Sequence, residues 1–138
     1  MNRRELIDYC LTYPDAYEDY PFDPLPDENA TAVIRHKNNR RSFALIMRHK
    51  GMLYLNLKGD PFEAELLRQA YQDLIPGWHM NKKHWITVEL LASTDLVLAA
   101  ELIEDSYDNV VAGLPLRLRS TLRTLGPAPR APGHLPLR

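Results

Sequence analysis

Cysteine, long apolar runs and clustered glycines are all scarce in this chain of 138 residues. The single cysteine, Cys10, cannot form a disulfide within the chain, which is typical of proteins from a reducing compartment. No apolar run approaches the roughly 18 residues that a membrane span requires. The early acidic residues Glu5 and Asp8 are unlike those of a signal peptide. We therefore expect a cytoplasmic location and no membrane partner.

The residue patterns of common catalytic and cofactor sites are also missing. The five histidines do not have the spacing of a known metal site, and no acidic residue lies between Asp73 and Glu89, around His79 and His84. No Gly-x-Ser-x-Gly motif supplies a nucleophile, and the six glycines are too scattered for a phosphate loop or a dinucleotide fingerprint. The sequence predicts no metal, no cofactor and no enzyme activity.

Acidic residues are absent after Asp108, and charge is sorted by segment elsewhere. Residues 15–28 hold six acids and no base, whereas residues 29–59 hold seven bases and no acid. Such blocks can steer an anionic partner to one face even though the net charge is only −1. Alternatively, the two blocks pair with each other in the folded protein. The sequence leaves both interpretations open.

What is present fits one α+β domain with a single antiparallel sheet backed by helices. A chain of this length can bury about two-thirds of its unfolded surface, and 45% hydrophobic residues are ordinary for a globular protein. Asn2 with Glu5 predicts a capping box, and Asp60-Pro61 predicts the start of a second helix. The expected elements are a helix over 2–12, strands over 16–22, 31–36, 42–47 and 52–58, a helix over 60–72, a strand over 83–89, and a helix from a cap at Ser93 or Thr94 to Gly113.

Side-chain periodicity predicts which faces are buried. Leu53, Leu55 and Leu57 alternate with polar residues, which predicts a strand with one dry and one wet face. In the second helix, Phe62 and Leu66 open the predicted buried stripe, which continues to Ala70 with Leu67 and Tyr71 alongside. Leucines and arginines over 114–125 predict a short basic helix that binds an anionic partner or docks on its own domain. The proline-rich segment 126–138 is expected to be a flexible tail.

The positive residues of the hairpins suggest nucleic-acid binding. Lysine and arginine on strands and turns can contact phosphates, so we expect a DNA-binding surface made of Arg40, Arg41, Arg48, Lys58, Lys82 and Lys83. Polar hairpin tips are also ordinary in soluble proteins, where charged side chains on strand edges block aggregation.

The densest stretch in polar and aromatic groups contains Trp78, His79, Asn81, His84 and Trp85. These side chains could line a pocket for a small molecule or a protein partner, as in a binding module of a stress or resistance pathway. They could instead hold a tight loop together, with the polar side chains hydrogen-bonding the backbone and the tryptophans filling the core beneath it.

Residues 76–85, with the sequence PGWHMNKKHW, closely resemble the signature of the MmcQ/YjbR-like bacterial proteins. Three further pieces agree with that family in order and spacing, namely residues 20–22, 55–61 and 105–111. The resemblance covers roughly residues 1–125, which we take as the domain.

The resemblance implies a compact α+β domain with a CyaY-like (frataxin-like) fold. Proteins of this kind are usually labelled DNA-binding proteins with a double-wing arrangement, a label that rests largely on structural analogy. It implies no enzyme activity and no established cofactor. By position, Lys82 and Lys83 match the basic pair of the family, and His79, Asn81, His84 and Trp85 match its polar and aromatic neighbours.

Overall fold

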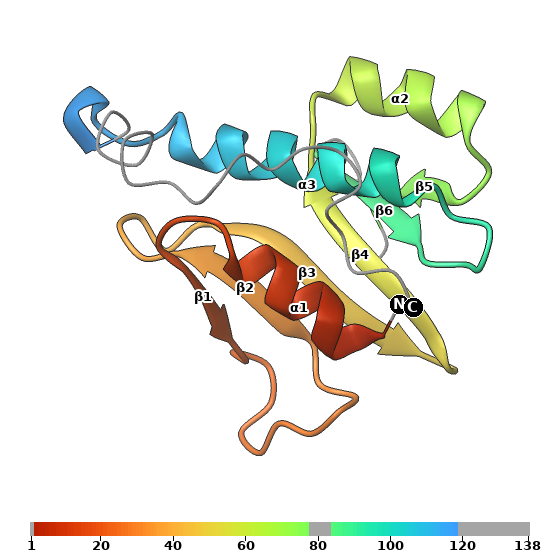
Figure 1. The fold of residues 1–138 in the computed structure, drawn as a ribbon, viewed down its shortest axis with the longest axis horizontal. Helices are drawn as coiled ribbons and strands as arrows, with labels where there is room; N and C mark the ends of the chain where they lie inside the picture. Colours follow the sequence, from red (N-terminus) through yellow and green to blue (C-terminus); the bar gives the residue numbers. More distant parts are fainter. Residues whose placement is uncertain (1, 78–83, 119–138) are drawn as a thin grey trace.

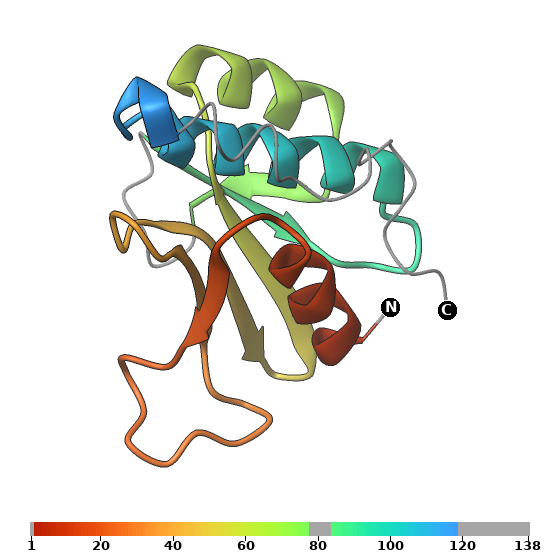
Figure 2. The same cartoon turned by 60° about the vertical axis from the view of Figure 1, so that its left-hand side comes forward.

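The computed structural model describes residues 2–77 and 84–118, and one antiparallel sheet dominates this part of the chain. The helices are α1 (Arg3–Leu11), α2 (Pro61–Ala70) and α3 (Leu96–Val111). The strands are β1 (Ala16–Asp19), β2 (Ala32–His36), β3 (Ser42–His49), β4 (Met52–Lys58), β5 (Leu74–Pro76) and β6 (Trp85–Glu89). They pair antiparallel in the order β1-β2-β3-β4-β6-β5, with α1 and α3 over one face of the sheet and α2 alongside α3 (Figures 1 and 2). The expected helix-backed antiparallel sheet is confirmed.

The first helix forms because its N-terminal amides find partners and its apolar side is buried. The Asn2 side chain accepts a hydrogen bond from the Glu5 amide at 2.8 Å, and Glu5 Oε1 accepts one from the Asn2 amide at 2.9 Å. This capping box was predicted. Cys10 lies in the core, where burial raises the pKa of its thiol to about 12. A thiol of this kind is not a nucleophile at neutral pH.

The core lies between the sheet and the helices. Leu6 of α1, Ile103 of α3 and the inward residues of the central strands form one buried cluster. In the described part of the chain, no helix is both long and apolar enough to cross a bilayer.

The opposite face of the sheet is not the wet face that the alternation in β4 predicted. Asn56 is fully buried there, accepts a hydrogen bond from the Thr87 hydroxyl, and donates to Met47 Sδ at 3.4 Å. Val33 and Leu45 pack with Trp85 in a second apolar cluster. The predicted dry face of Leu53, Leu55 and Leu57 is confirmed, but the wet face was wrong at Asn56, because β4 is a central strand flanked by β3 and β6.

The predicted buried stripe of α2 was right at Leu67 but wrong at Phe62 and Leu66. Phe62 is 69% and Leu66 is 51% exposed, whereas Ala64 is buried and Leu67 packs against the core. The start of the helix was right, because the Asp60 side chain accepts a hydrogen bond from the Phe62 amide and proline follows. The periodicity of the sequence predicted that α2 is a helix. The elements that pack against α2 decide which of its sides is buried.

Two further details differ from the sequence prediction. Asp95 caps α3 by accepting hydrogen bonds from the Val97 and Leu98 amides, whereas Thr94 uses its hydroxyl to donate to Glu89 O at 2.9 Å. β5, a three-residue strand that ends in Pro76, was not predicted. Proline is tolerated there because β5 lies at the edge of the sheet.

Candidate functional site

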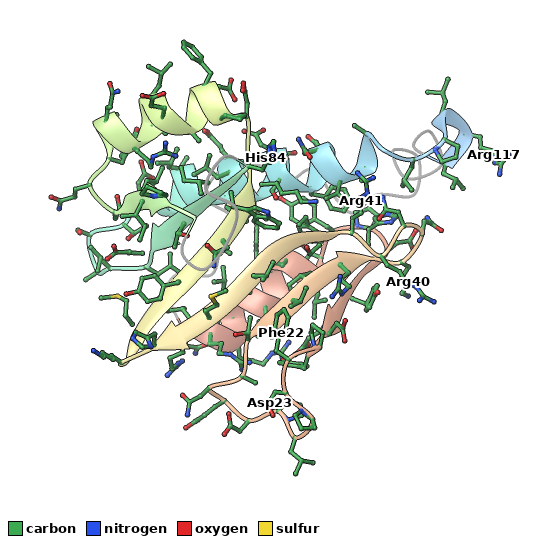
Figure 3. All side chains as sticks on the ribbon, turned by 180° about the vertical axis from the view of Figure 1, so that it is seen from behind. Phe22, Asp23, Arg40, Arg41, His84 and Arg117 are labelled. Atoms are coloured by element: carbon green, nitrogen blue, oxygen red, sulfur yellow. The ribbon has the colours of Figure 1, made fainter. Side chains whose placement is uncertain are left out.

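Two of the predicted DNA-binding residues lie in the turn between β2 and β3. The Asn39 side chain organises this turn, because its Oδ1 accepts a hydrogen bond from the Arg41 amide at 3.0 Å and its Nδ2 donates to Val110 O at 3.2 Å. The second bond ties the turn to the C-terminal end of α3. Arg40 and Arg41 are exposed at this end of the molecule, toward which Arg117 also lies (Figure 3).

Lys58 comes to the same end from a different strand. It is the last residue of β4, its amide donates to the Ser106 hydroxyl at 2.9 Å, and its Nζ lies 5.4 Å from the centroid of the Trp85 ring. Partial burial lowers the pKa of the Lys58 ammonium, and the nearby positive charge of Arg41 lowers it further. The positive charges of Arg41 and Lys58 therefore repel each other, although Arg41 precedes β3 and Lys58 ends β4.

Arg48 is placed apart from the other predicted residues. It pairs with Leu53 beside the β3–β4 turn, whereas Lys58 is at the far end of β4, opposite Trp85. Seven residue steps along an extended strand separate Arg41 from Arg48 by roughly 23 Å. The structure thus places Arg40, Arg41 and Lys58 at one end of the β3–β4 hairpin and Arg48 at the opposite end.

The suggested pairing of the acidic and basic blocks is confirmed only in part. Arg35 Nε lies 2.8 Å from Asp19 Oδ2, an ion pair between the two blocks across β1 and β2. Glu18 of the acidic block pairs instead with Arg4 of α1 at 3.0 Å, which lowers the pKa of the Glu18 carboxyl. Within residues 2–77 and 84–118, the predicted bases Arg40, Arg41, Arg48 and Lys58 form no ion pair.

A shallow hollow of about 700 Å³ adjoins the β2–β3 turn. It is lined by Tyr17, Asp19, Arg35, Lys37 and Arg40. Asp19 is already paired with Arg35. Lys37 and Arg40 therefore dominate the charge at the turn side of this hollow.

Most of the signature stretch falls outside the described residues, namely Trp78, His79, Asn81, Lys82 and Lys83. Trp85 is only 8% exposed and packs in the second apolar cluster, as the core interpretation expects of a tryptophan here. His84 is exposed, and its carbonyl accepts a hydrogen bond from the Gly59 amide at 3.1 Å. A Cβ at Gly77 would lie 2.8 Å from Trp85 Cβ, so only glycine fits at this close approach.

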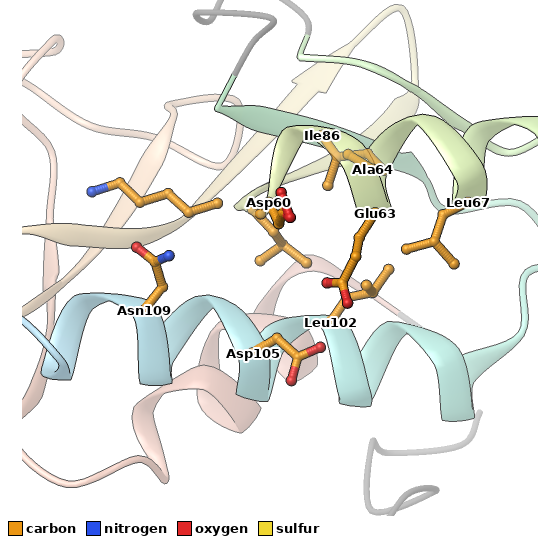
Figure 4. Close-up of a pocket in the computed structure, with 11 residues that line it drawn as sticks. Asp60, Glu63, Ala64, Leu67, Ile86, Leu102, Asp105 and Asn109 are labelled. Carbon is orange, nitrogen blue, oxygen red and sulfur yellow. The ribbon is translucent and has the colours of Figure 1, made fainter.

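A cleft that sequence reasoning missed opens beside Lys58, between α2, α3 and the ends of β4 and β6. It holds about 180 Å³ and is lined by Leu57, Lys58, Gly59, Asp60, Glu63, Ala64, Leu67, Ile86, Leu102, Asp105 and Asn109 (Figure 4). A more open hollow of about 340 Å³ shares Lys58, Gly59 and Asn109 and continues to His84 and Trp85. Asp105 was not among the candidate site residues of the sequence analysis. Its i, i+4 spacing with Asn109 was the available signal, because that spacing places both on one helix face.

Metal ligation has no support in the described residues, where no group of three or more His, Cys, Asp or Glu side chains could hold an ion. This finding covers neither His79 nor any other position between 78 and 83.

Comparison with known proteins identifies the family. The family model described as YjbR matches residues 11–109, well over half of the chain. The chain belongs to the YjbR family. The Escherichia coli protein YjbR, described as uncharacterized, is 34% identical over 122 residues, which cover 88% of this chain and 98% of that protein. Bacillus subtilis YyaQ is 32% identical over 117 residues, covering 78% and 96%. Escherichia coli YbdF is 41% identical over 81 residues, covering 59% of this chain and 66% of that protein.

Solved structures share the fold of this YjbR-family chain. The crystal structure of the Deinococcus radiodurans protein DR2400, with a DUF419 domain, has a TM-score of 0.75 at 32% identity and covers 99% of this chain and 96% of its own. A Pseudomonas syringae protein gives a TM-score of 0.68 at 33% identity, covering 80% and 99%.

Three of the four pieces of sequence that resemble the YjbR family meet at the cleft and the open hollow beside it. Lys58 and Asp60 come from the second piece, Asp105 and Asn109 from the last, and His84 from the signature itself. The Lys58 amide and the Ser106 hydroxyl join two of these pieces directly. Segments that are far apart in sequence therefore build one local structure.

Proposed function

We propose that this YjbR-family chain is a non-enzymatic, cofactor-free protein that binds the DNA backbone through its basic end, which we define as Lys37, Arg40, Arg41 and Lys58. The CyaY-like, double-wing assignment belongs to the same proposal. The observation that carries it is the convergence of Arg40, Arg41 and Lys58, from two separate strand ends, with no ion pair to another described residue.

Physical considerations favour a phosphate partner at this end. Arg41 and Lys58 repel each other, which contributes to the lowered pKa of Lys58, and a phosphate between them would relieve that repulsion. Arg40 and Arg41 are exposed on a turn that Asn39 holds against α3, so their backbone positions are fixed before binding. The contacts are few, so we expect weak binding that depends strongly on salt.

Anisotropy of a short fluorescein-labelled duplex, measured between about 50 mM and about 200 mM NaCl, tests the proposal. Each phosphate contact contributes a slope of about −0.9 in log K against log salt. The double variant Arg40→Ala, Arg41→Ala should therefore bind more weakly and make the slope shallower by about 2. The matched control is Arg48→Ala, which removes the same charge from the opposite end of the hairpin and should leave affinity and slope unchanged.

Two outcomes would contradict the proposal. One is the absence of any binding at low salt. The other is an equal loss of affinity in Arg48→Ala and in either single variant, Arg40→Ala or Arg41→Ala, because a diffuse effect of charge would not distinguish the two ends of the hairpin.

A further inference from the structure

The cleft between α2 and α3 has an apolar floor in addition to its polar rim. Leu57 and Ile86 come from the sheet, Ala64 and Leu67 from α2, and Leu102 from α3. The volume of about 180 Å³ is that of roughly six water molecules, at about 30 Å³ each in the liquid. An apolar floor with a few polar groups at one side is typical of a site for a small organic ligand.

The polar groups of the rim converge without pairing. Figure 4 shows Glu63 extending from α2 toward α3, where Asp105 and Asn109 lie on the facing side. Asp60 is committed to capping α2, since its Oδ1 accepts a hydrogen bond from the Phe62 amide at 3.2 Å. The side chains of Glu63, Asp105 and Asn109 form no hydrogen bond or ion pair with another residue in the described ranges. They remain available to a ligand.

The charged residues of the rim indicate whether that ligand carries a positive or a negative charge. Among the described residues, three carboxylates, Asp60, Glu63 and Asp105, line the cleft with one cation, Lys58. The Lys58 ammonium lies over the Trp85 ring at 5.4 Å rather than against a carboxylate. Burial raises the pKa of the Asp105 carboxyl, and the negative charges of Glu104 and Glu101 raise it further. The excess of carboxylates over cations on this rim favours a positive group in the cleft and disfavours an anion.

We propose that this cleft binds a small organic amine, with the ammonium held between Glu63 and Asp105 and a compact apolar body seated on Leu57, Ile86 and Leu102. Asn109 can accept one ammonium hydrogen bond with its side-chain oxygen. The site shares only Lys58 with the basic end used for DNA, and Glu63 and Asp105, which would hold the ammonium, are not part of that end, so either proposal can fail alone.

The probe is cyclohexylamine, whose six-carbon ring suits the volume of the cleft. Titrated into the full chain and followed by amide chemical shifts, it should give saturable changes at Ala64, Leu102, Asp105 and Asn109. A fragment of this size should bind with a Kd of roughly a millimolar. Cyclohexanol should bind much more weakly, and cyclohexanecarboxylate should cause no saturable change, because these two probes keep the ring and replace the ammonium with a neutral hydroxyl or a negative carboxylate.

The variants Asp105→Asn and Glu63→Gln should each weaken cyclohexylamine about tenfold, the size of one charge-assisted contact. Glu65→Gln is the matched control, since it removes an equal charge from an exposed position of α2 that does not line the cleft.

The proposal is overturned if cyclohexylamine gives no saturable change, or if the three probes bind equally. It is also overturned if the double variant of Glu63 and Asp105 binds like the unmodified chain, or if Glu65→Gln weakens binding as much as Glu63→Gln does. Amide spectra and thermal unfolding of each variant show that the fold is retained.

Discussion

Arg40 combines an unfavourable backbone conformation with an exposed positive side chain. Its φ is +58°, in the left-handed region that favours glycine, while its amide donates to His36 O at 2.8 Å. An L-residue other than glycine costs roughly 1–2 kcal/mol in this conformation. The turn therefore accepts a conformational cost at the position where the proposed DNA contact lies.

Replacing this arginine should separate stability from binding. We expect Arg40→Gly to raise the free energy of unfolding by roughly 0.5–1 kcal/mol, because relief of strain outweighs the extra freedom of glycine in the unfolded chain. Arg40→Ala keeps the strain and should leave stability unchanged, yet both variants should weaken DNA binding alike. Urea unfolding and the anisotropy titration measure the two effects. Equal stability of the glycine and alanine variants would show that the turn relaxes and stores no strain.

At the scale of elements, one buried hydroxyl connects α3 to the sheet beside the site. Ser106 is fully buried, and its Oγ donates to Phe43 O at 2.5 Å while accepting the Lys58 amide at 2.9 Å. α3, β3 and the end of β4 therefore meet at a single side chain. Its position fixes Lys58 relative to Asp105 and Asn109, which lie on the same helix.

Ser106→Ala should destabilise the protein by roughly 2–3 kcal/mol, since it leaves the Lys58 amide and the Phe43 carbonyl buried with no partner. Ser106→Cys is the better comparison, because it keeps a weak donor and acceptor, and it should lose less stability than Ser106→Ala. Ser106→Gly is less informative because glycine also disturbs the helix. Urea unfolding gives both values. If alanine lowers the free energy of unfolding by less than about 0.5 kcal/mol, the hydroxyl does not join these elements.

Local signals in the sequence account for much of the fold. The Asn2–Glu5 capping box placed α1, the Asp60-Pro61 pair placed the start of α2, and β4 was predicted with the same ends that it has in the structure. These signals depend on residues close together in the chain. β5 was missed because three residues ending in proline carry no period, and its partner β6 is what makes it a strand.

The candidate sites depend on contacts that no local pattern records. The DNA-binding surface predicted from the sequence includes Arg41, Lys58 and Arg48, although the hairpin of β3 and β4 puts Arg48 beside its turn and the other two at its open end. Glu63 and Asp105 face each other because α2 and α3 pack side by side over Ile86. The sequence did not predict this arrangement, because the predicted buried stripe of α2 included Phe62 and Leu66, which are exposed. Residue types suggested basic phosphate contacts, but topology decides which bases share a surface.

At the scale of the whole molecule, acid should destabilise the fold through one buried histidine before it breaks the ion pairs. His36 is fully buried, with Nδ1 accepting the Asn38 amide at 3.2 Å and Nε2 lacking a partner among the described residues. The Tyr107 ring lies 5.9 Å away. Burial lowers the pKa of His36, and the negative charge of Asp15 only partly opposes this. The imidazole is therefore held neutral in the folded protein.

The sign of the effect follows from linkage between protonation and folding. Below the ordinary histidine pKa of about 6.5, the unfolded chain binds a proton that the folded chain does not, so stability falls as pH falls. The slope should approach about 1.4 kcal/mol per pH unit until the folded-state pKa is reached, and no such loss occurs above about 7. Glu18 contributes the same sign only when pH falls below the ordinary glutamate pKa of about 4.3, toward its own lowered pKa, and that range lies below this window. Urea unfolding between about pH 7.5 and about pH 5.5 tests this. His36→Asn, which keeps an acceptor near the position of Nδ1, should flatten the profile. A profile that stays steep in His36→Asn would assign the acid sensitivity to another group.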